Sequence, residues 1–239
     1  MSKEMRKAMG WWRWGLASLA ALAVAGVLAI GFTYPAIAAG LCASCLGMER
    51  IAPRVSVEPA MSAAGRKRLL AHGAQARSKV AAVWGAQPPA VRWVACVSIN
   101  CDRRLGGLGA SAVTLSTPLG STIHLSPGGL NATIMAHELA HATLHGMVGV
   151  RRQMSGDLPA WMDEGMAVLV SGDRRFLDEN DTPLNCLHLP DALPRSPSVW
   201  GPASGKNTDL YRQAACRVFS YQKPVARLAQ KLADGWSPE

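Results

Sequence analysis

The sequence lacks the features that would assign it at once to several classes of protein. It contains no internal repeat and no low-complexity tract, which excludes repeat architectures and long biased segments. It also lacks a nucleic-acid-binding motif, so we expect no nucleic acid partner. Acidic residues are scarce, since 16 Asp and Glu stand against 25 Lys and Arg and give a formal net charge of +9. We expect most of this charge to be solvated surface, with an anionic lipid or an acidic wall polymer as the alternative partner.

A second absence is the lack of any charged residue from Trp14 to Met48. The apolar centre of this stretch is Leu16–Ile30, and four basic residues lie before it at positions 3–13. About 20 apolar residues cross a bilayer, and basic residues mark its cytoplasmic side. We therefore expect residues 1–41 to be a cytoplasmic N-terminus and one transmembrane helix in the inner membrane, with the rest periplasmic. The alternative is a signal peptide with Ala36-Ile37-Ala38 as its cleavage site, which would release a secreted protein.

The cysteines support export. All six follow the apolar stretch: Cys42, Cys45, Cys96, Cys101, Cys186 and Cys216. An even count in an oxidising compartment predicts disulfides, although the count alone does not fix the pairing. Proximity favours Cys96–Cys101 and Cys186–Cys216. For the C-x-x-C pair Cys42 and Cys45 we expect a disulfide or two free thiols rather than a redox centre or a metal site.

The remaining patterns predict one α+β domain at 61–239, with a mixed sheet, after a linker at 42–60. The expected elements are a helix over 60–83, strands at 91–97, 112–115 and 122–125, a helix over 132–146, a second helix after Pro159, a long loop at 173–209 and a closing helix at 210–232, broken near Pro224. This order is typical of an α+β arrangement.

His137-Glu138-Leu139-Ala140-His141 matches H-E-x-x-H, the signature of zinc hydrolases. On a helix, His137 and His141 lie one turn apart on the same face, so both imidazoles can reach one metal ion. Glu138 then lies beside the metal, where it can act as a general base toward a water molecule.

The residues around the motif favour a helix from about 132 to 146. Asn131 or Thr133 can cap its N-terminus, because short polar side chains accept hydrogen bonds from the first free amides. Gly146 or Gly149 can close its C-terminus. A helix in this position would hold both histidines rigidly.

A catalytic zinc site needs a third protein ligand and an open position for water. The longer H-E-x-x-H-x-x-G-x-x-H pattern is absent, because Leu144 and Met147 occupy its last two key positions. His145 lies about 80° around the helix from His137, so we expect it at the surface or behind the site. Glu164, on the next predicted helix, is the expected third ligand and completes a set of two His and one Glu.

H-E-x-x-H followed by Trp161-Met162-Asp163-Glu164-Gly165-Met166-Ala167 resembles the gluzincin branch of the zincin metallopeptidases. It is most similar to the aminopeptidase-like group, whose second motif is W-L-x-E-G-x-A. The resemblance covers roughly residues 90–225 and is specific over the two motifs. It implies a small zincin-like metallopeptidase domain that binds Zn²⁺ through His137, His141 and Glu164 and uses Glu138 as general base.

The resemblance also implies two supporting residues. Asp163 matches a family position that usually carries Asn or Asp and lies next to the ligands. Tyr211, in the segment 209–214, is similar to a family tyrosine that stabilises an oxyanion, although a tyrosine packed in a helix face is the alternative. His124 and His188 are further candidates for that role. The family segment G-x-M-E-N, which binds a substrate's free amino terminus, is absent, so exopeptidase specificity is not implied.

These features together predict a membrane-anchored, zinc-dependent peptidase that acts on a peptide or protein outside the cytoplasm. A strand at 108–115 is expected to hold the extended substrate by backbone hydrogen bonds. One alternative is a zinc-dependent amidase acting on cell-wall peptides. The other is a non-catalytic exported binding module with a structural or vestigial zinc site, against which the intact Glu138 argues.

Overall fold

The structure is a computed structural model that describes residues 18, 26, 33–107, 109–118, 120–186 and 192–238. Within these residues we find no helix that is long and apolar enough to cross a bilayer. The expected membrane span Leu16–Ile30 lies outside the described residues, apart from Ser18 and Gly26.

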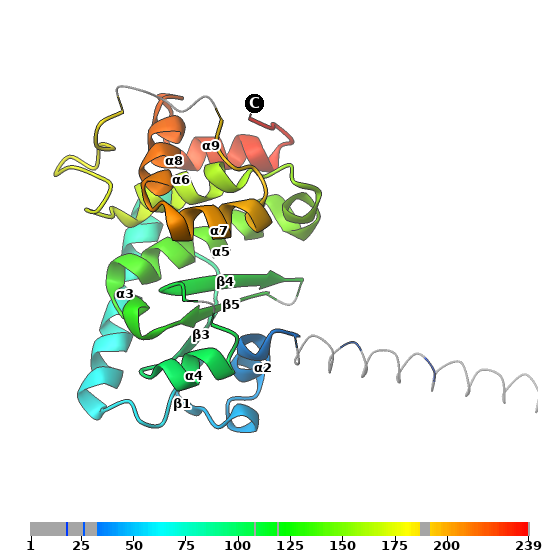
Figure 1. The fold of residues 1–239 in the computed structure, drawn as a ribbon, viewed down its shortest axis with the longest axis vertical. Coiled ribbons are helices and arrows are strands. Elements are labelled where there is room, and N and C mark those ends of the chain that lie inside the picture. Colours follow the sequence, from blue (N-terminus) through cyan, green and yellow to red (C-terminus); the bar gives the residue numbers. More distant parts are fainter. Residues whose placement is uncertain are drawn as a thin grey trace, which may run out of the picture.

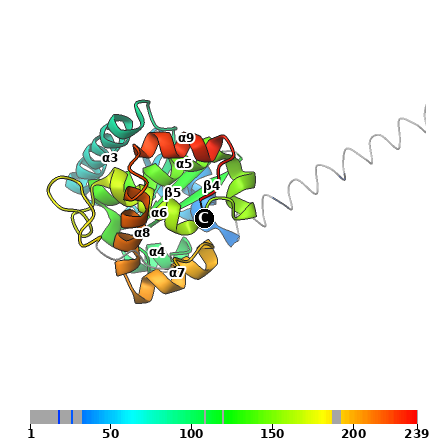
Figure 2. The same cartoon turned by 90° about the horizontal axis from the view of Figure 1, so that it is seen from above.

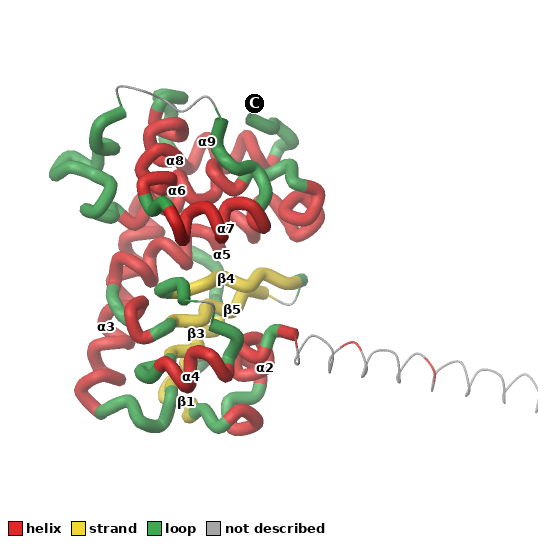
Figure 3. Tube along the Cα trace, in the orientation of Figure 1, coloured by secondary structure: helices red, strands yellow, loops and turns green. Residues whose placement is uncertain are grey.

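A five-stranded mixed sheet fills the lower half of the molecule (Figures 1 and 3). Its strands are β1 (Glu49–Ala52), β2 (Val55–Val57), β3 (Arg92–Ala95), β4 (Ala112–Thr117) and β5 (Gly120–Leu125). The spatial order is β1-β2-β3-β5-β4, in which β2, β3 and β5 run parallel while β1 and β4 are antiparallel edge strands. The expected α+β class with a mixed sheet is confirmed.

Part of residues 42–60, a segment that we expected to be a linker, belongs to the sheet. β1 and β2 lie within them, and β2 continues the sheet by pairing with β3. The helix α2 (Pro35–Leu41), inside the segment expected as membrane anchor, packs against β3 and β5. Strands of four and three residues are too short to show the alternation by which a strand is recognised in a sequence.

Helices cover both faces of the sheet (Figure 1). α3 (Ala63–Trp84) and α5 (Ala132–Ser155) pack on one face and share a core with Trp93 and Ile123. α2 and α4 (Ile99–Arg104) cover the other face, where Val94 joins their core. Since neighbouring strand residues point to opposite faces, the sheet is buried on both sides.

Four helices form the upper half of the molecule, over α5 (Figures 1 and 2). They are α6 (Ala160–Ser171), α7 (Pro197–Lys206), α8 (Asp209–Phe219) and α9 (Val225–Ala233). A side chain at Gly165 would place its Cβ 2.4 Å from the carbonyl oxygen of Ala214. Only glycine therefore permits the close approach of α6 and α8, which explains the glycine that follows Glu164.

The segment 173–209, expected to be a loop, contains the helix α7. Pro197 opens this helix, where its missing amide proton costs no hydrogen bond, and Pro202 lies inside it. Two prolines and four glycines or serines obscure any helical periodicity, so the prediction of a loop was wrong here. The closing helix is divided as expected, since Pro224 separates α8 from α9.

All six cysteines form disulfides: Cys42–Cys45, Cys96–Cys101 and Cys186–Cys216. Both predicted pairs are confirmed, and the C-x-x-C pair is oxidised. Cys186–Cys216 joins the loop after α6 to α8. Arg212 adds to this attachment by donating hydrogen bonds to the carbonyl oxygens of Leu184 and Asn185.

Replacing Cys186 and Cys216 together by Ser is expected to destabilise the fold substantially. The two residues are 30 apart in the sequence, and a loop of this length predicts a loss of about 3–4 kcal/mol in the free energy of unfolding. The measurement is denaturant unfolding of the full chain. The matched control replaces Cys42 and Cys45, only 3 residues apart, for which we expect about 1–2 kcal/mol. Equal losses in both variants would contradict the explanation by loop length.

Candidate metal centre

α5 carries the H-E-x-x-H residues and is longer than predicted. Its N-cap is Asn131, whose side chain accepts a hydrogen bond from the amide of Ile134 at 3.0 Å. Gly149, with φ of 77°, interrupts the helix but does not end it, and Gly156 forms the C-cap. Glycine adopts this left-handed conformation without strain, so the chain resumes helical geometry beyond it.

α6 brings Glu164 to the two histidines. One oxygen of its carboxylate, Oε2, lies 3.2 Å from Nε2 of His137 and 3.5 Å from Nε2 of His141. The ligand atoms of the three residues all lie within 4.8 Å of one another. The structure thus brings together the three predicted ligands, from two different helices, around one position.

Asp163 fixes the orientation of His141. Its Oδ1 lies 2.7 Å from Nδ1 of His141, so that nitrogen donates a proton to the carboxylate. The other ring nitrogen, Nε2, faces Glu164 and is the one that could bind a metal ion. A carboxylate behind a metal-binding histidine commonly sets the tautomer in this way.

Glu138 is buried beside the three ligands and contacts the edge strand β4. The hydroxyl of Thr114 lies 2.7 Å from Oε2 of Glu138 and 2.9 Å from its main-chain carbonyl oxygen. Thr114 of the strand therefore holds this carboxylate in place. Glu138 does not belong to the group of possible metal-binding atoms of His137, His141 and Glu164.

Burial and charge act against each other in this cluster. Burial alone would lower the pKa of His141, but the carboxylates of Asp163 and Glu164 raise it well above its ordinary value. Burial would likewise raise the pKa of Asp163, which His141 and His145 nevertheless lower. For Glu164 the two histidines overcome burial and lower the pKa to about 2. Both carboxylates are therefore ionised.

The cluster suits a divalent cation. Asp163 and Glu164 are neighbours on α6, and within the described part of the chain both contact histidine rings. Such a concentration of negative charge away from water is costly without a compensating positive charge. Two imidazole nitrogens and one carboxylate oxygen are donors that a divalent cation accepts readily.

Tyr211, on α8, lies next to this cluster. Its ring centroid is 6.1 Å from that of His137, and it also packs against the rings of Phe176 at 5.6 Å and Trp200 at 5.5 Å. Burial raises the pKa of the Tyr211 phenol, and the charge of Glu164 raises it further. The phenol therefore stays protonated.

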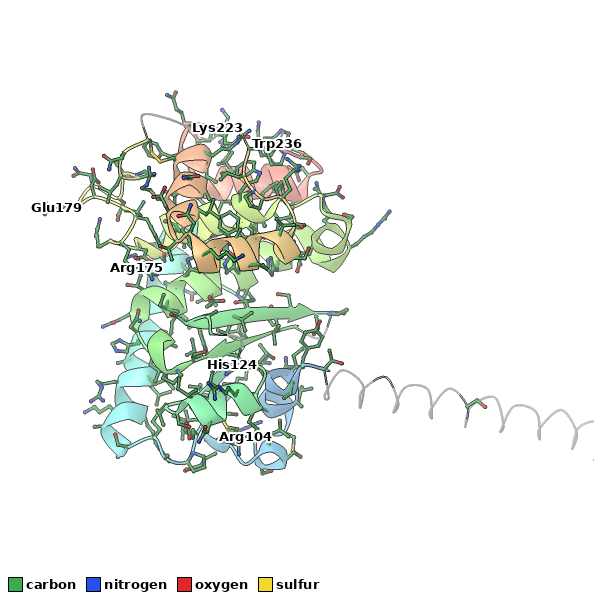
Figure 4. The ribbon with its side chains drawn as sticks, in the orientation of Figure 1. Arg104, His124, Arg175, Glu179, Lys223 and Trp236 are labelled. Atoms are coloured by element: carbon green, nitrogen blue, oxygen red, sulfur yellow. A yellow bond between two sulfur atoms is a disulfide. The ribbon has the colours of Figure 1, made fainter. Side chains whose placement is uncertain are left out.

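The other two candidates for that role are not in the site. His124 is buried on β5, with Nε2 3.3 Å from Asp102 of α4, on the sheet face opposite α5 (Figure 4). Burial lowers its pKa, which Asp102 partly opposes. His188 lies outside the described residues.

Sequence reasoning missed several residues around the centre. Thr114 and Ser116 are two residues apart on β4, so their side chains lie on the same face of the strand and both point toward α5. Asp173, only 3% exposed, is close enough to His137 for their charges to interact. Arg175, expected as free surface charge, donates hydrogen bonds to both carboxylate oxygens of Asp173. The alternating hydroxyls of the strand were a visible signal, whereas nothing local linked Asp173 to the motif.

Comparisons of the chain with protein-family models, with curated proteins and with solved structures find no match. The function of the centre must therefore be judged from its own residues and their geometry.

Proposed function

We propose that this protein is a zinc-dependent peptidase of the zincin type that hydrolyses peptide bonds outside the cytoplasm. The observation that carries the proposal is the convergence of His137, His141 and Glu164 on one position, with Glu138 beside it but not among the ligands. Two histidines and one glutamate form a known catalytic zinc set, which leaves a coordination position open for water. A purely structural site has no use for the additional buried carboxylate.

Each residue has a task in the proposed reaction. When bound, zinc would polarise the scissile carbonyl and acidify the attacking water. Glu138 takes a proton from that water and delivers it to the leaving amine. Thr114 keeps the Glu138 carboxylate in place, and Asp163 does the same for the ring of His141. Tyr211 donates its phenol proton to a hydrogen bond with the developing oxyanion.

The edge strand favours a peptide as substrate. Among the residues that the structure describes, β4 pairs with β5 on one side and no strand pairs with it on the other. An extended peptide can add to such an edge through main-chain hydrogen bonds, which a non-peptide amide cannot form in series. β4 spans Ala112–Thr117 and so lies slightly later than the strand expected at 108–115.

The proposed location is the periplasmic side of the inner membrane, with the apolar stretch Leu16–Ile30 as anchor and α2 as part of the folded domain. Three disulfides support an oxidising compartment, because the cytoplasm keeps thiols reduced. Secretion after cleavage of a signal peptide is the alternative.

The proposal is tested by metal analysis together with cleavage assays. We expect one zinc per chain by mass spectrometry, and cleavage of casein that a chelator abolishes and added zinc restores. Cleavage of cell-wall fragments in place of casein would favour the amidase. Stoichiometric zinc with neither activity would favour the binding module and overturn the proposal.

Tyr211→Phe tests the oxyanion donor. We expect kcat to fall about 10²-fold, because one hydrogen bond to the transition state is lost, with KM and zinc content unchanged. Tyr221→Phe is the matched control, since that ring packs on Trp236 away from the centre. Unchanged kcat in Tyr211→Phe would leave Tyr211 with a packing role only.

A further inference from the structure

A chain of hydrogen bonds extends from the metal ligands into the sheet. It begins with His141, whose Nδ1 is 2.7 Å from Oδ1 of Asp163. The second oxygen of Asp163, Oδ2, lies 2.8 Å from Nε2 of His145. Nδ1 of His145 in turn lies 2.9 Å from the hydroxyl of Ser116, which is 3.0 Å from the hydroxyl of Ser121. Side chains from α5, α6, β4 and β5 thus form one connected set.

The position of His145 follows from helix geometry. It lies one turn beyond His141 on α5, so the two rings are neighbours and their centroids are 5.8 Å apart. Both rings therefore face the same carboxylate of Asp163 from α6. The side chain of His145 is 13% exposed and that of Asp163 is 17% exposed, so the bonds between them are largely shielded from water.

One set of donor roles satisfies every member of the chain. His141 and His145 each donate an N–H to a different oxygen of Asp163. The hydroxyl of Ser116 donates to Nδ1 of His145, and the hydroxyl of Ser121 donates to Ser116. Because each Asp163 oxygen has its own histidine, the carboxylate is held in one rotation, and so is the ring of His141.

The edge strand is tied to α5 at two points. Thr114 contacts Glu138, and Ser116, two residues later on the same face of β4, contacts His145. The strand that is proposed to hold the substrate is thereby fixed in register with both the general base and the residue behind the metal ligand.

We propose that His145 is a positioning residue, braced by Ser116, which holds Asp163 and through it keeps the ring of His141 in position for the metal ion. The inference rests on the proposed function only for the identity of the ion. Groups of this kind behind metal ligands typically contribute 10–100-fold to metal affinity. His145 would therefore act on metal binding without touching the metal or the substrate.

The test measures the zinc dissociation constant by competition with a chelating indicator, together with the melting temperature of the zinc-free protein. We expect His145→Ala to weaken zinc binding about 10–100-fold. His145→Gln should restore most of the affinity, because an amide can donate to Asp163 and accept from Ser116. Ser116→Ala should give a smaller loss in the same direction. His72→Ala is the matched control, because the ring of His72 lies on α3 and contacts the side chain of Gln75 at 3.4 Å; this variant should bind zinc as the wild type does.

Zinc affinity in His145→Ala equal to that of the wild type would overturn this inference and leave the proposed function standing. A wild-type chain that binds no zinc would overturn both. If His145→Ala does not fold, the zinc affinity of Ser116→Ala is compared with that of Thr117→Ala as control. The hydroxyl of Thr117 donates a hydrogen bond to the carbonyl oxygen of Gly120. Equal zinc affinity in those two variants would overturn the inference, and weaker binding in Ser116→Ala alone supports it.

Discussion

Glu138→Gln is expected to retain zinc and lose hydrolysis. Glutamine has nearly the same shape as glutamate and can still bond to Thr114, but it cannot accept a proton from water. General base catalysis typically contributes 10²–10⁴-fold, so kcat should fall by about that factor. The measurement combines kcat on a peptide substrate with zinc content by mass spectrometry.

Glu179→Gln is the matched control for this variant, because Glu179 lies exposed on the outer loop (Figure 4). It should retain full activity. Turnover by Glu138→Gln within a few-fold of the wild type would remove Glu138 as the base, whatever the zinc content.

Glu164→Ala is expected to lose zinc altogether under conditions that saturate the wild type. The variant leaves two histidines on one helix, and it removes the proposed ligand on α6. Loss of a direct ligand should exceed the 10–100-fold typical of residues behind the ligands. Zinc at about 100 times its dissociation constant should raise the wild-type free energy of unfolding by about 2.7 kcal/mol and leave that of the variant unchanged.

The measurement is unfolding of each protein with and without zinc, and Glu179→Ala serves as the exposed control. An equal stabilisation of Glu164→Ala by zinc would mean that the ion binds elsewhere. The proposed ligand set would then be wrong.

Part of the centre was accessible from local sequence alone. The separation of His137 and His141 by one helical turn needs only a helix, and the residues from Asn131 onward favour one. Glu164 was accessible through the short connection to a second helix with its own start signal at Pro159. Tyr211 is different, because its place near His137 depends on how α8 packs against α6.

The supporting residues were beyond local reasoning. Ser116 meets His145 only because β4 pairs with β5 in a particular register beside α5, and a shift of one residue would turn its hydroxyl to the opposite face. The angle of His145 around the helix left open whether its side chain lay at the surface or behind the site. The packing of α6 and β4 against α5 places it behind the site.

The α+β class and the helices that carry the two motifs follow from the amino-acid sequence, and the cysteine spacing favours the pairings Cys96–Cys101 and Cys186–Cys216 without deciding them. The class and the helices depend on residues near one another in the chain, because residue spacing and helix or strand propensity determine local structure. Three features became visible in the folded structure alone: residues 49–57 complete the sheet, α7 interrupts the expected loop, and the edge strand forms hydrogen bonds with Glu138 and His145. Those outcomes depend on which faces are buried against each other, and contacts between distant segments leave no periodic trace in either segment alone.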